Sequence, residues 1–100
     1  MLVRRRFMDM PFGQIHYREA GTLDLPPLML LHASPGSSKQ LEFLIENLGK
    51  QFHVIAPDTM GNGDSTPPKQ EQPEISDYAN AMIAFSNQLG WKKMHLYGTH

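Results

Sequence analysis

The residues best suited to chemistry lie in three short polar segments, residues 32–38, 58–65 and 98–100. The first reads His-Ala-Ser-Pro-Gly-Ser-Ser and stands between an apolar run and a helical pattern. Backbone N–H groups near a helix N-terminus suit a developing negative charge, so this segment is a candidate oxyanion site. Taken alone, it fits an ordinary strand-to-helix turn as well. It does not fit a phosphate-binding loop, because Gly-x-Gly-x-x-Gly spacing and a P-loop lysine are absent.

The second segment, Asp-Thr-Met-Gly-Asn-Gly-Asp-Ser, combines glycines with side chains that hydrogen bond to their own backbone in turns. Its carboxylates resemble those of a calcium loop, but no glutamate closes a twelve-residue loop at the required spacing. We therefore predict a structural turn without a metal. His16, His53 and His95 lie in or beside predicted strands with no carboxylate at ligand spacing, which favours structural or surface roles. The absence of cysteine excludes disulfides, thiolate metal sites and cysteine nucleophiles.

Composition argues against several classes of partner. The formal net charge of −1 offers no electrostatic attraction to nucleic acid or an anionic membrane. The basic run Arg4 to Arg6 is typical of a solvated strand end, and no apolar stretch follows it that would indicate a secretory signal. The run Leu28 to Leu31 is far too short to span a membrane. We expect a cytoplasmic protein with no nucleic-acid or membrane partner.

Strands are expected to position these segments. Residues 3–20 alternate in polarity around Pro11-Phe12-Gly13, which predicts an antiparallel hairpin with a tight turn. Later apolar runs are continuous, as in parallel strands that are buried on both faces. These parallel strands are predicted near residues 28–32, 52–57 and 93–98.

Helices are predicted near residues 38–49 and 76–89, between the parallel strands. Ser37 and Gln40 match a capping box at the start of the first helix, and Ser76 is the expected cap of the second. A glycine follows each helix and is expected to end it.

The order of the elements predicts the fold class. A hairpin followed by strand, helix, strand, helix and strand (βαβαβ) indicates an α/β protein with a mostly parallel sheet and right-handed crossovers. Ligands of such sheets bind outside the carboxyl ends of the strands. All three polar segments would lie there.

The polar segments carry three motifs in a fixed order. His32 to Gly36 reads His-Ala-Ser-Pro-Gly, Asp58 to Ser65 reads Asp-x-x-Gly-x-Gly-x-Ser, and Gly98 to His100 opens a turn after a strand. Together with Pro11 to Tyr17, they resemble the α/β-hydrolase superfamily, in the branch that holds esterases, lactonases, epoxide hydrolases and haloalkane dehalogenases. The matching family elements are the oxyanion segment, the second strand-end loop and the Gly-x-nucleophile-x-Gly elbow. The resemblance implies that residues 1–100 are the N-terminal half of a catalytic domain.

This resemblance assigns roles to individual residues. The backbone N–H of Ser34 would donate to the oxyanion, and His32 would brace the loop instead of acting as a base. Ala33 replaces the family's usual glycine, which strains the turn only if its φ is positive. If Gly98 is the first glycine of the elbow, His100 occupies the nucleophile position. In a register shifted by one residue, His100 would precede a serine that lies beyond it.

The first register leaves three roles open for His100. A neutral imidazole can accept an acyl group or act as a general base toward water, or the histidine fills the site of a lost nucleophile. For the full-length protein, the resemblance implies a hydrolase of a small ester, lactone or related carbonyl compound, without a cofactor. The alternatives are a non-catalytic ligand-binding protein and, on the same scaffold, a lyase or cofactor-free oxygenase.

The chain alone is expected to be inactive, because the family's acid and catalytic histidine follow the elbow. Its last strand, Met94 to Tyr97, would also become an exposed apolar edge. We therefore expect residues 1–100 to fold poorly by themselves. They would belong to a longer chain or be stabilised by association into a homo-oligomer.

Overall fold

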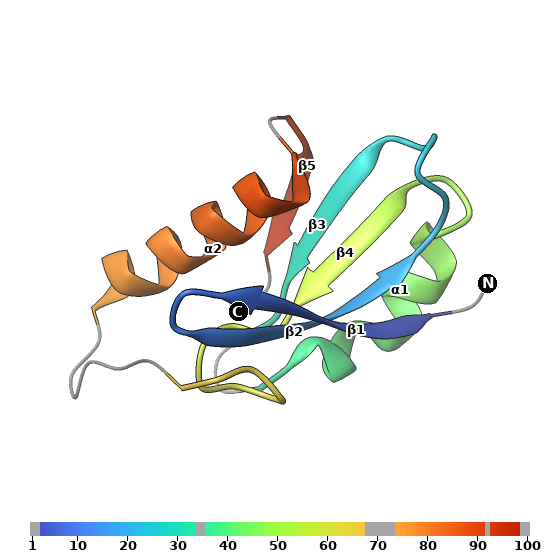
Figure 1. Cartoon of the computed structure of the whole chain (residues 1–100). Coiled ribbons are helices and arrows are strands. Elements are labelled where there is room, and N and C mark those ends of the chain that lie inside the picture. The colour runs from blue at the N-terminus through green and yellow to red at the C-terminus, as the bar shows by residue number, and fades with distance from the viewer. Residues whose placement is uncertain (1–2, 34–35, 68–73, 92, 99–100) are drawn as a thin grey trace.

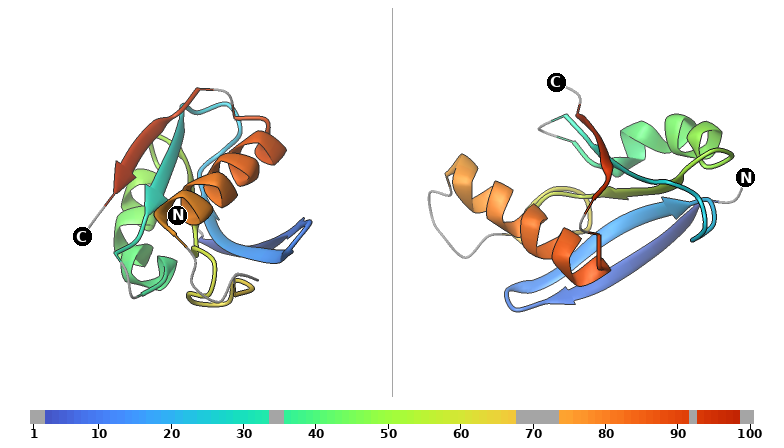
Figure 2. Two further views of the ribbon diagram at one scale, coloured as in Figure 1. Left: turned by 90° about the vertical axis from the view of Figure 1, so that its left-hand side faces the viewer. Right: turned by 90° about the horizontal axis from the view of Figure 1, so that it is seen from above.

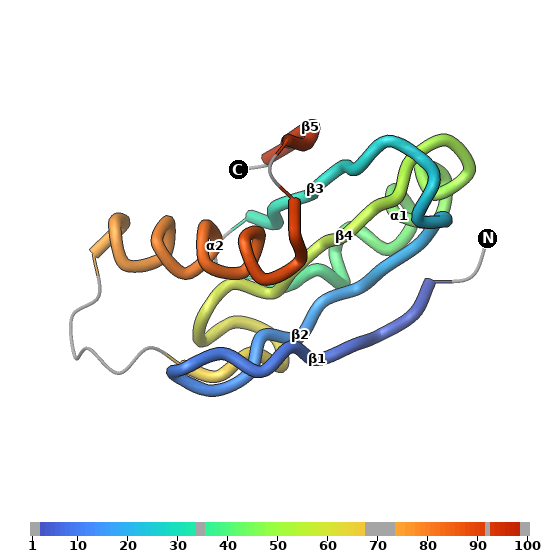
Figure 3. Tube along the Cα trace, turned by 45° about the horizontal axis from the view of Figure 1, so that its top comes forward, coloured from blue at the N-terminus to red at the C-terminus, as the bar shows by residue number. Residues whose placement is uncertain are grey.

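The computed structural model describes residues 3–33, 36–67, 74–91 and 93–98 (Figure 1). Its strands form one sheet in the order β1-β2-β4-β3-β5, and Figure 3 shows β1 and β5 at opposite edges. The strands are β1 (Arg4–Met10), β2 (Gly13–Ala20), β3 (Pro27–Leu31), β4 (His53–Pro57) and β5 (His95–Gly98). The helical elements are the 3-10 turn η1 (Ser38–Leu41) and the helices α1 (Glu42–Leu48) and α2 (Ile75–Leu89). No helix within the described ranges is long and apolar enough to cross a membrane.

The predicted hairpin is confirmed. Strands β1 and β2 pair antiparallel, with Met10 opposite Gly13 across the turn. Gly13 has a φ of 144°, and a Cβ there would come within 2.7 Å of the Thr66 side chain. A side chain at this position would therefore be both strained and crowded. Strand β2 then pairs antiparallel with β4, which joins the hairpin to the rest of the sheet.

The three later strands are parallel, as predicted. Strand β3 lies between β4 and β5 and pairs with both in the parallel direction. Apolar side chains alternate between the two faces, and both faces are covered by a helix, which explains the continuous apolar runs. The carboxyl ends of all three strands therefore meet at one edge of the sheet (Figure 1).

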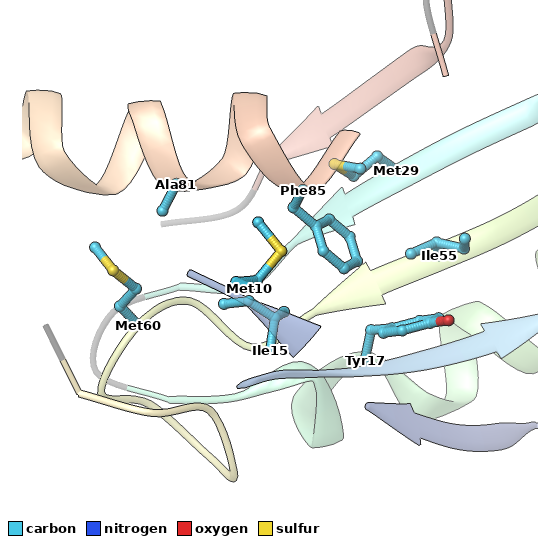
Figure 4. Close-up of a cluster of buried hydrophobic side chains, with 8 residues drawn as sticks. All are labelled: Met10, Ile15, Tyr17, Met29, Ile55, Met60, Ala81 and Phe85. Atoms are coloured by element: carbon cyan, nitrogen blue, oxygen red, sulfur yellow. The ribbon is translucent and has the colours of Figure 1, made fainter. Parts of the chain in front are cut away.

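Helices α1 and α2 cover opposite faces of the sheet (Figure 2). On the α2 face, Phe85 packs edge-on against Tyr17 at 5.3 Å between ring centroids (Figure 4). On the α1 face, Ile45 is completely buried in a separate cluster. The α2 cluster contains Met10, Ile15, Tyr17, Met29, Ile55, Met60, Ala81 and Phe85. The α1 cluster contains Ala20, Leu28, Leu30, Leu41, Ile45, Val54 and Ala56.

The first helix start differs in detail from the prediction. Ser37 is the N-cap, but its hydroxyl accepts a hydrogen bond from the Lys39 N–H at 3.2 Å. The Gln40 N–H instead bonds to the Ser37 carbonyl, which winds the first turn as a 3-10 helix. The predicted capping box on Gln40 is therefore replaced by a tighter turn.

The predicted N-cap of the second helix is wrong by two residues. Glu74, in extended conformation, is the N-cap of α2, and it forms a reciprocal capping box with Asp77. Ser76 therefore lies inside the first turn, because a glutamate side chain supplies the cap that serine was expected to supply. At the other end, Gly90 adopts the left-handed conformation with φ 81° and ends the helix as predicted.

Candidate functional site

Two of the three polar segments meet beyond the carboxyl ends of β3 and β4. His32 links them: its Nε2 accepts the backbone N–H of Thr59 at 3.1 Å, and its Nδ1 lies 2.8 Å from the Ala33 carbonyl oxygen. Because an amide N–H can only donate, Nε2 carries no proton, and Nδ1 holds the proton that is donated to Ala33. This geometry matches the bracing role that the family resemblance implies for His32.

The loop after β3 tolerates alanine where the family usually has glycine. No described residue other than glycine has a positive φ, so Ala33 causes no backbone strain. Gly36, by contrast, has no room for a side chain. A Cβ there would lie 2.8 Å from the Ala33 carbonyl oxygen and would also overlap the Gln40 side chain. The Ala33 carbonyl oxygen thus accepts a hydrogen bond from His32 and lies too close to Gly36 for a side chain at that position.

Two predicted site residues, Ser34 and His100, lie outside the described residues. Their roles as oxyanion donor and as occupant of the nucleophile position remain predictions. The described residues next to them are Ala33 and Gly36 in the loop and Gly98 at the end of β5. The parallel pairing of β5 with β3, in which Leu31 lies opposite Gly98, puts these two strand ends side by side.

Asp58 anchors the second loop. Its side chain is 1% exposed, and one carboxylate oxygen accepts the Ser38 N–H at 2.7 Å. The other oxygen accepts the Asp64 N–H at 3.0 Å and lies 2.8 Å from Nδ1 of His16. Burial by itself raises the pKa of Asp58, but the hydrogen bonds from Ser38, Asp64 and His16 together outweigh it and hold the pKa below its usual value. Asp58 is therefore a carboxylate that binds two loops and a strand together.

His16 is part of this buried cluster, and sequence reasoning missed its partner. Arg5 donates from Nε to Nε2 of His16 at 3.1 Å, so the imidazole proton is on Nδ1 and points to Asp58. His16 has no carboxylate at ligand spacing along the sequence, but the antiparallel register of β2 and β4 brings Asp58 to it from 42 residues away. The structural role expected for His16 agrees with this contact. The family motif indicated that Asp58 is important. No sequence pattern indicated the register of β2 with β4, which places Asp58 beside His16.

His16, Asp58 and Asp64 each offer a ligand atom, and these atoms lie within 4.8 Å of one another. They nevertheless do not fit a metal ion. Both nitrogens of His16 and both oxygens of Asp58 already take part in hydrogen bonds. The carboxylate of Asp64 contacts the Arg5 guanidinium at 2.5 Å. A cation would have to replace these partners beside a permanent positive charge, so the cluster is best explained as structural.

Ser65 and Gly63 complete the second loop. The Ser65 hydroxyl donates to the Asp58 carbonyl at 2.7 Å and accepts the His16 N–H at 3.0 Å. Gly63 has a φ of 51°, and a Cβ there would overlap the Asp58 carboxylate. The spacing of this motif is therefore explained by the need to build a tight turn around one buried carboxylate.

The fold and these motifs define a member of a known family. A family model described as alpha/beta hydrolase fold matches residues 26–99, and the chain belongs to this family. An uncharacterized carboxylesterase from Bacillus subtilis is 30% identical over 92 residues, which are 92% of this chain and 31% of that protein. A haloalkane dehalogenase from Mycobacterium tuberculosis is 34% identical over 85 residues, 85% of this chain and 29% of that protein.

Solved structures agree with this assignment. A haloalkane dehalogenase variant from Bradyrhizobium elkanii superimposes with a TM-score of 0.92 at 26% identity, covering 98% of this chain and 32% of that one. The naproxen esterase from Bacillus subtilis gives a TM-score of 0.86 at 30% identity, covering 97% of this chain and 34% of that one. The chain thus spans about a third of the length of the relatives it matches.

Proposed function

We propose that the full-length protein is a hydrolase that acts on a small ester, lactone or related carbonyl compound. The observation that carries the proposal is the junction of the two strand-end loops through His32, beside the end of β5. This is the edge where sheets of this class bind ligands. The names of a carboxylesterase and a naproxen esterase among the similar proteins support the same type of reaction.

In this proposal, the backbone N–H of Ser34 donates to the oxyanion that forms when the substrate carbonyl is attacked. A single donor of this kind is worth about 100- to 1000-fold in kcat. His100 acts as general base: it takes a proton from the attacking water and returns it to the leaving alcohol. We prefer this role to acyl transfer because an acyl-imidazole is labile, and because a histidine nucleophile would displace the family's catalytic histidine.

The alternative is a ligand-binding protein in which His100 fills the site of a lost nucleophile. In both proposals the partner is a small molecule, the protein is cytoplasmic, and neither a cofactor nor a metal takes part. Nucleic acid and membranes have no role in either one. The two differ only in whether a bound ester is turned over.

A substrate panel tests the proposal. The full-length protein should hydrolyse at least one member of a panel of activated esters and lactones, measured by release of acid at constant pH. A haloalkane belongs in the same panel, since dehalogenases are among the relatives. Release of halide without ester or lactone hydrolysis would contradict the proposed substrate class, and binding without turnover of any compound would support the alternative.

We also propose that residues 1–100 are the N-terminal half of the catalytic domain. An apolar groove of about 800 Å³ lies between α2 and β5. Ile83 of α2 and Leu96 of β5 line it and are 58% and 64% exposed. Apolar side chains that gather in one groove, instead of being scattered singly, are typical of a face that another element covers.

The direction of the crossovers indicates what covers the groove. The connection from β3 to β4 moves one way across the sheet and places α1 on one face, while the connection from β4 to β5 moves the other way and places α2 on the opposite face. A further strand beside β5 would continue the second direction. Because crossovers are right-handed, its helix would lie on the α2 face, in this groove.

This proposal predicts different behaviour for the 100-residue chain and the full-length protein. The short chain should self-associate or unfold without a cooperative transition, because β5 and the groove are uncovered. The full-length protein should unfold cooperatively. Analytical ultracentrifugation and denaturant titration measure both properties. A monomeric 100-residue chain with a sharp unfolding transition would contradict the prediction, while a stable homo-oligomer would show that a second copy can supply the missing cover.

A further inference from the structure

A chain of hydrogen bonds runs from the second loop to the backbone of the first. The Asn62 side-chain amide donates to the Thr59 hydroxyl at 2.7 Å, and this hydroxyl lies 3.3 Å from Nε2 of His32. The Thr59 N–H also donates to Nε2, and Nδ1 of His32 donates to the Ala33 carbonyl. Because the Thr59 oxygen accepts from Asn62, its own proton is available to Nε2, whose single lone pair it shares with the Thr59 N–H. Every bond in the chain therefore points in the same direction, from Asn62 to Ala33.

We propose that Thr59 and Asn62 are positioning residues for the oxyanion donor of the reaction proposed above, acting through His32. The proposal rests on that function, in which the donor is the N–H that follows the Ala33 carbonyl in the same peptide group. A peptide group is planar. The bond from His32 to the Ala33 carbonyl oxygen therefore constrains the orientation of this peptide group.

The hydrogen bonds from Asn62 to the Ala33 carbonyl also make the proposed oxyanion N–H a stronger donor. A peptide whose carbonyl accepts a hydrogen bond is polarised, and aligned hydrogen bonds in series strengthen one another. The imidazole must remain the Nδ1–H tautomer for this arrangement, and the Thr59 N–H enforces it because it occupies Nε2. Thr59 is partly buried and is held in its turn by the Asn62 N–H, which donates to the Thr59 carbonyl at 2.9 Å. The series of hydrogen bonds therefore starts in a hydrogen-bonded turn that contains Thr59 and Asn62.

Thr59→Val tests the contribution of the hydroxyl, since valine keeps the shape of threonine and the backbone N–H. In the full-length protein we expect kcat for an ester substrate to fall about 10-fold with KM unchanged, because the oxyanion forms only after substrate binding. Thr59→Ser should restore most of kcat. Inhibition by an alkyl phosphonate monoanion, which carries a charged oxygen like the oxyanion, should weaken by a similar factor in Thr59→Val.

The matched control is Thr22→Val. Thr22 is an exposed threonine whose hydroxyl bonds to Asp24, in the turn after β2 at the opposite end of the sheet. Its replacement should change neither kcat nor phosphonate inhibition. Wild-type kcat in Thr59→Val, or a rise in KM with unchanged kcat, would overturn the proposal. If Thr59→Val does not fold, Asn62→Ala takes its place, with the same fall in kcat expected.

A spectroscopic measurement separates this proposal from the proposed function. The ring ¹⁵N shifts of His32 in the full-length protein should report the neutral Nδ1–H tautomer in the absence of any substrate. If no ester is hydrolysed but this tautomer is found, the proposed reaction fails while the hydrogen-bond chain stands. An Nε2–H tautomer would overturn the chain whether or not the protein is an esterase.

Discussion

Replacing Asp58 by asparagine is expected to lower the free energy of unfolding of the full-length protein by about 3 kcal/mol or more. The carboxylate accepts three hydrogen bonds in a buried site, from Ser38, Asp64 and His16. Asparagine keeps one acceptor oxygen and turns an N–H₂ group toward groups that can only donate. At least one buried donor is then left without a partner, which is costly.

Denaturant titration of both proteins measures this loss, and Asp24→Asn is the control. Asp24 is an exposed aspartate in the turn after β2, whose carboxylate accepts a hydrogen bond from the nearby Thr22 hydroxyl, so its replacement should change the free energy of unfolding by no more than about 0.5 kcal/mol. Wild-type stability in Asp58→Asn would contradict the structural role assigned to this residue.

The effect of Asp58 should depend on pH. Hydrogen bonds hold its pKa in the folded protein below the usual value, so its contribution is fully present above the unfolded pKa of about 3.9. The contribution is lost as the pH falls through the lower folded-state pKa. The difference in stability between wild type and Asp58→Asn should therefore narrow below about pH 4. A difference that stays constant into this acid range would contradict the prediction.

Gly36→Ala is expected to lower kcat of the full-length protein about 100-fold, since a displacement of the order of 1 Å near a reacting group has effects of this size. The added Cβ would lie 2.8 Å from the Ala33 carbonyl oxygen, closer than real Cβ contacts come. The Ala33 peptide must then move, and the proposed oxyanion donor moves with it.

The Gln40 side chain is the other group that this Cβ would meet, and it can be removed separately. In Gly36→Ala/Gln40→Ala, only the clash with the Ala33 carbonyl remains, so kcat should stay low. Recovery of wild-type kcat in the double variant would show that displacement of Gln40, and not of the Ala33 peptide, causes the loss.

Much of the fold could be predicted from the sequence because its signals are local. Continuous apolar runs identify the parallel strands, and Pro11 to Gly13 identify the hairpin turn. The start of α2 was misplaced because a serine and a glutamate two residues apart can both cap a helix. Glu74 is the cap because its side chain accepts from the Asp77 backbone N–H, while the Asp77 side chain accepts from the Glu74 backbone N–H. This pair of hydrogen bonds exists only in the folded turn.

The site was only partly predictable. Family motifs identified His32, Asp58 and Ser65, because these loops recur with fixed spacing. The partnership of His16 with Asp58 depends on the pairing of β2 with β4, which joins residues 42 apart. The link from Thr59 to His32 likewise joins two loops. Such contacts depend on strand register and on how loops pack together. Neither produces a periodic pattern or a fixed residue spacing that could be recognised in a single sequence.

Comparison of the full-length protein with its His100→Ala variant tests the central proposal most directly. Both are assayed on the esters and lactones that the wild type hydrolyses, and phosphonate binding is measured in parallel. If His100 is the general base, kcat/KM should fall about 100- to 10,000-fold while phosphonate binding is retained. Equal kcat/KM values for the two proteins would contradict a catalytic role for His100.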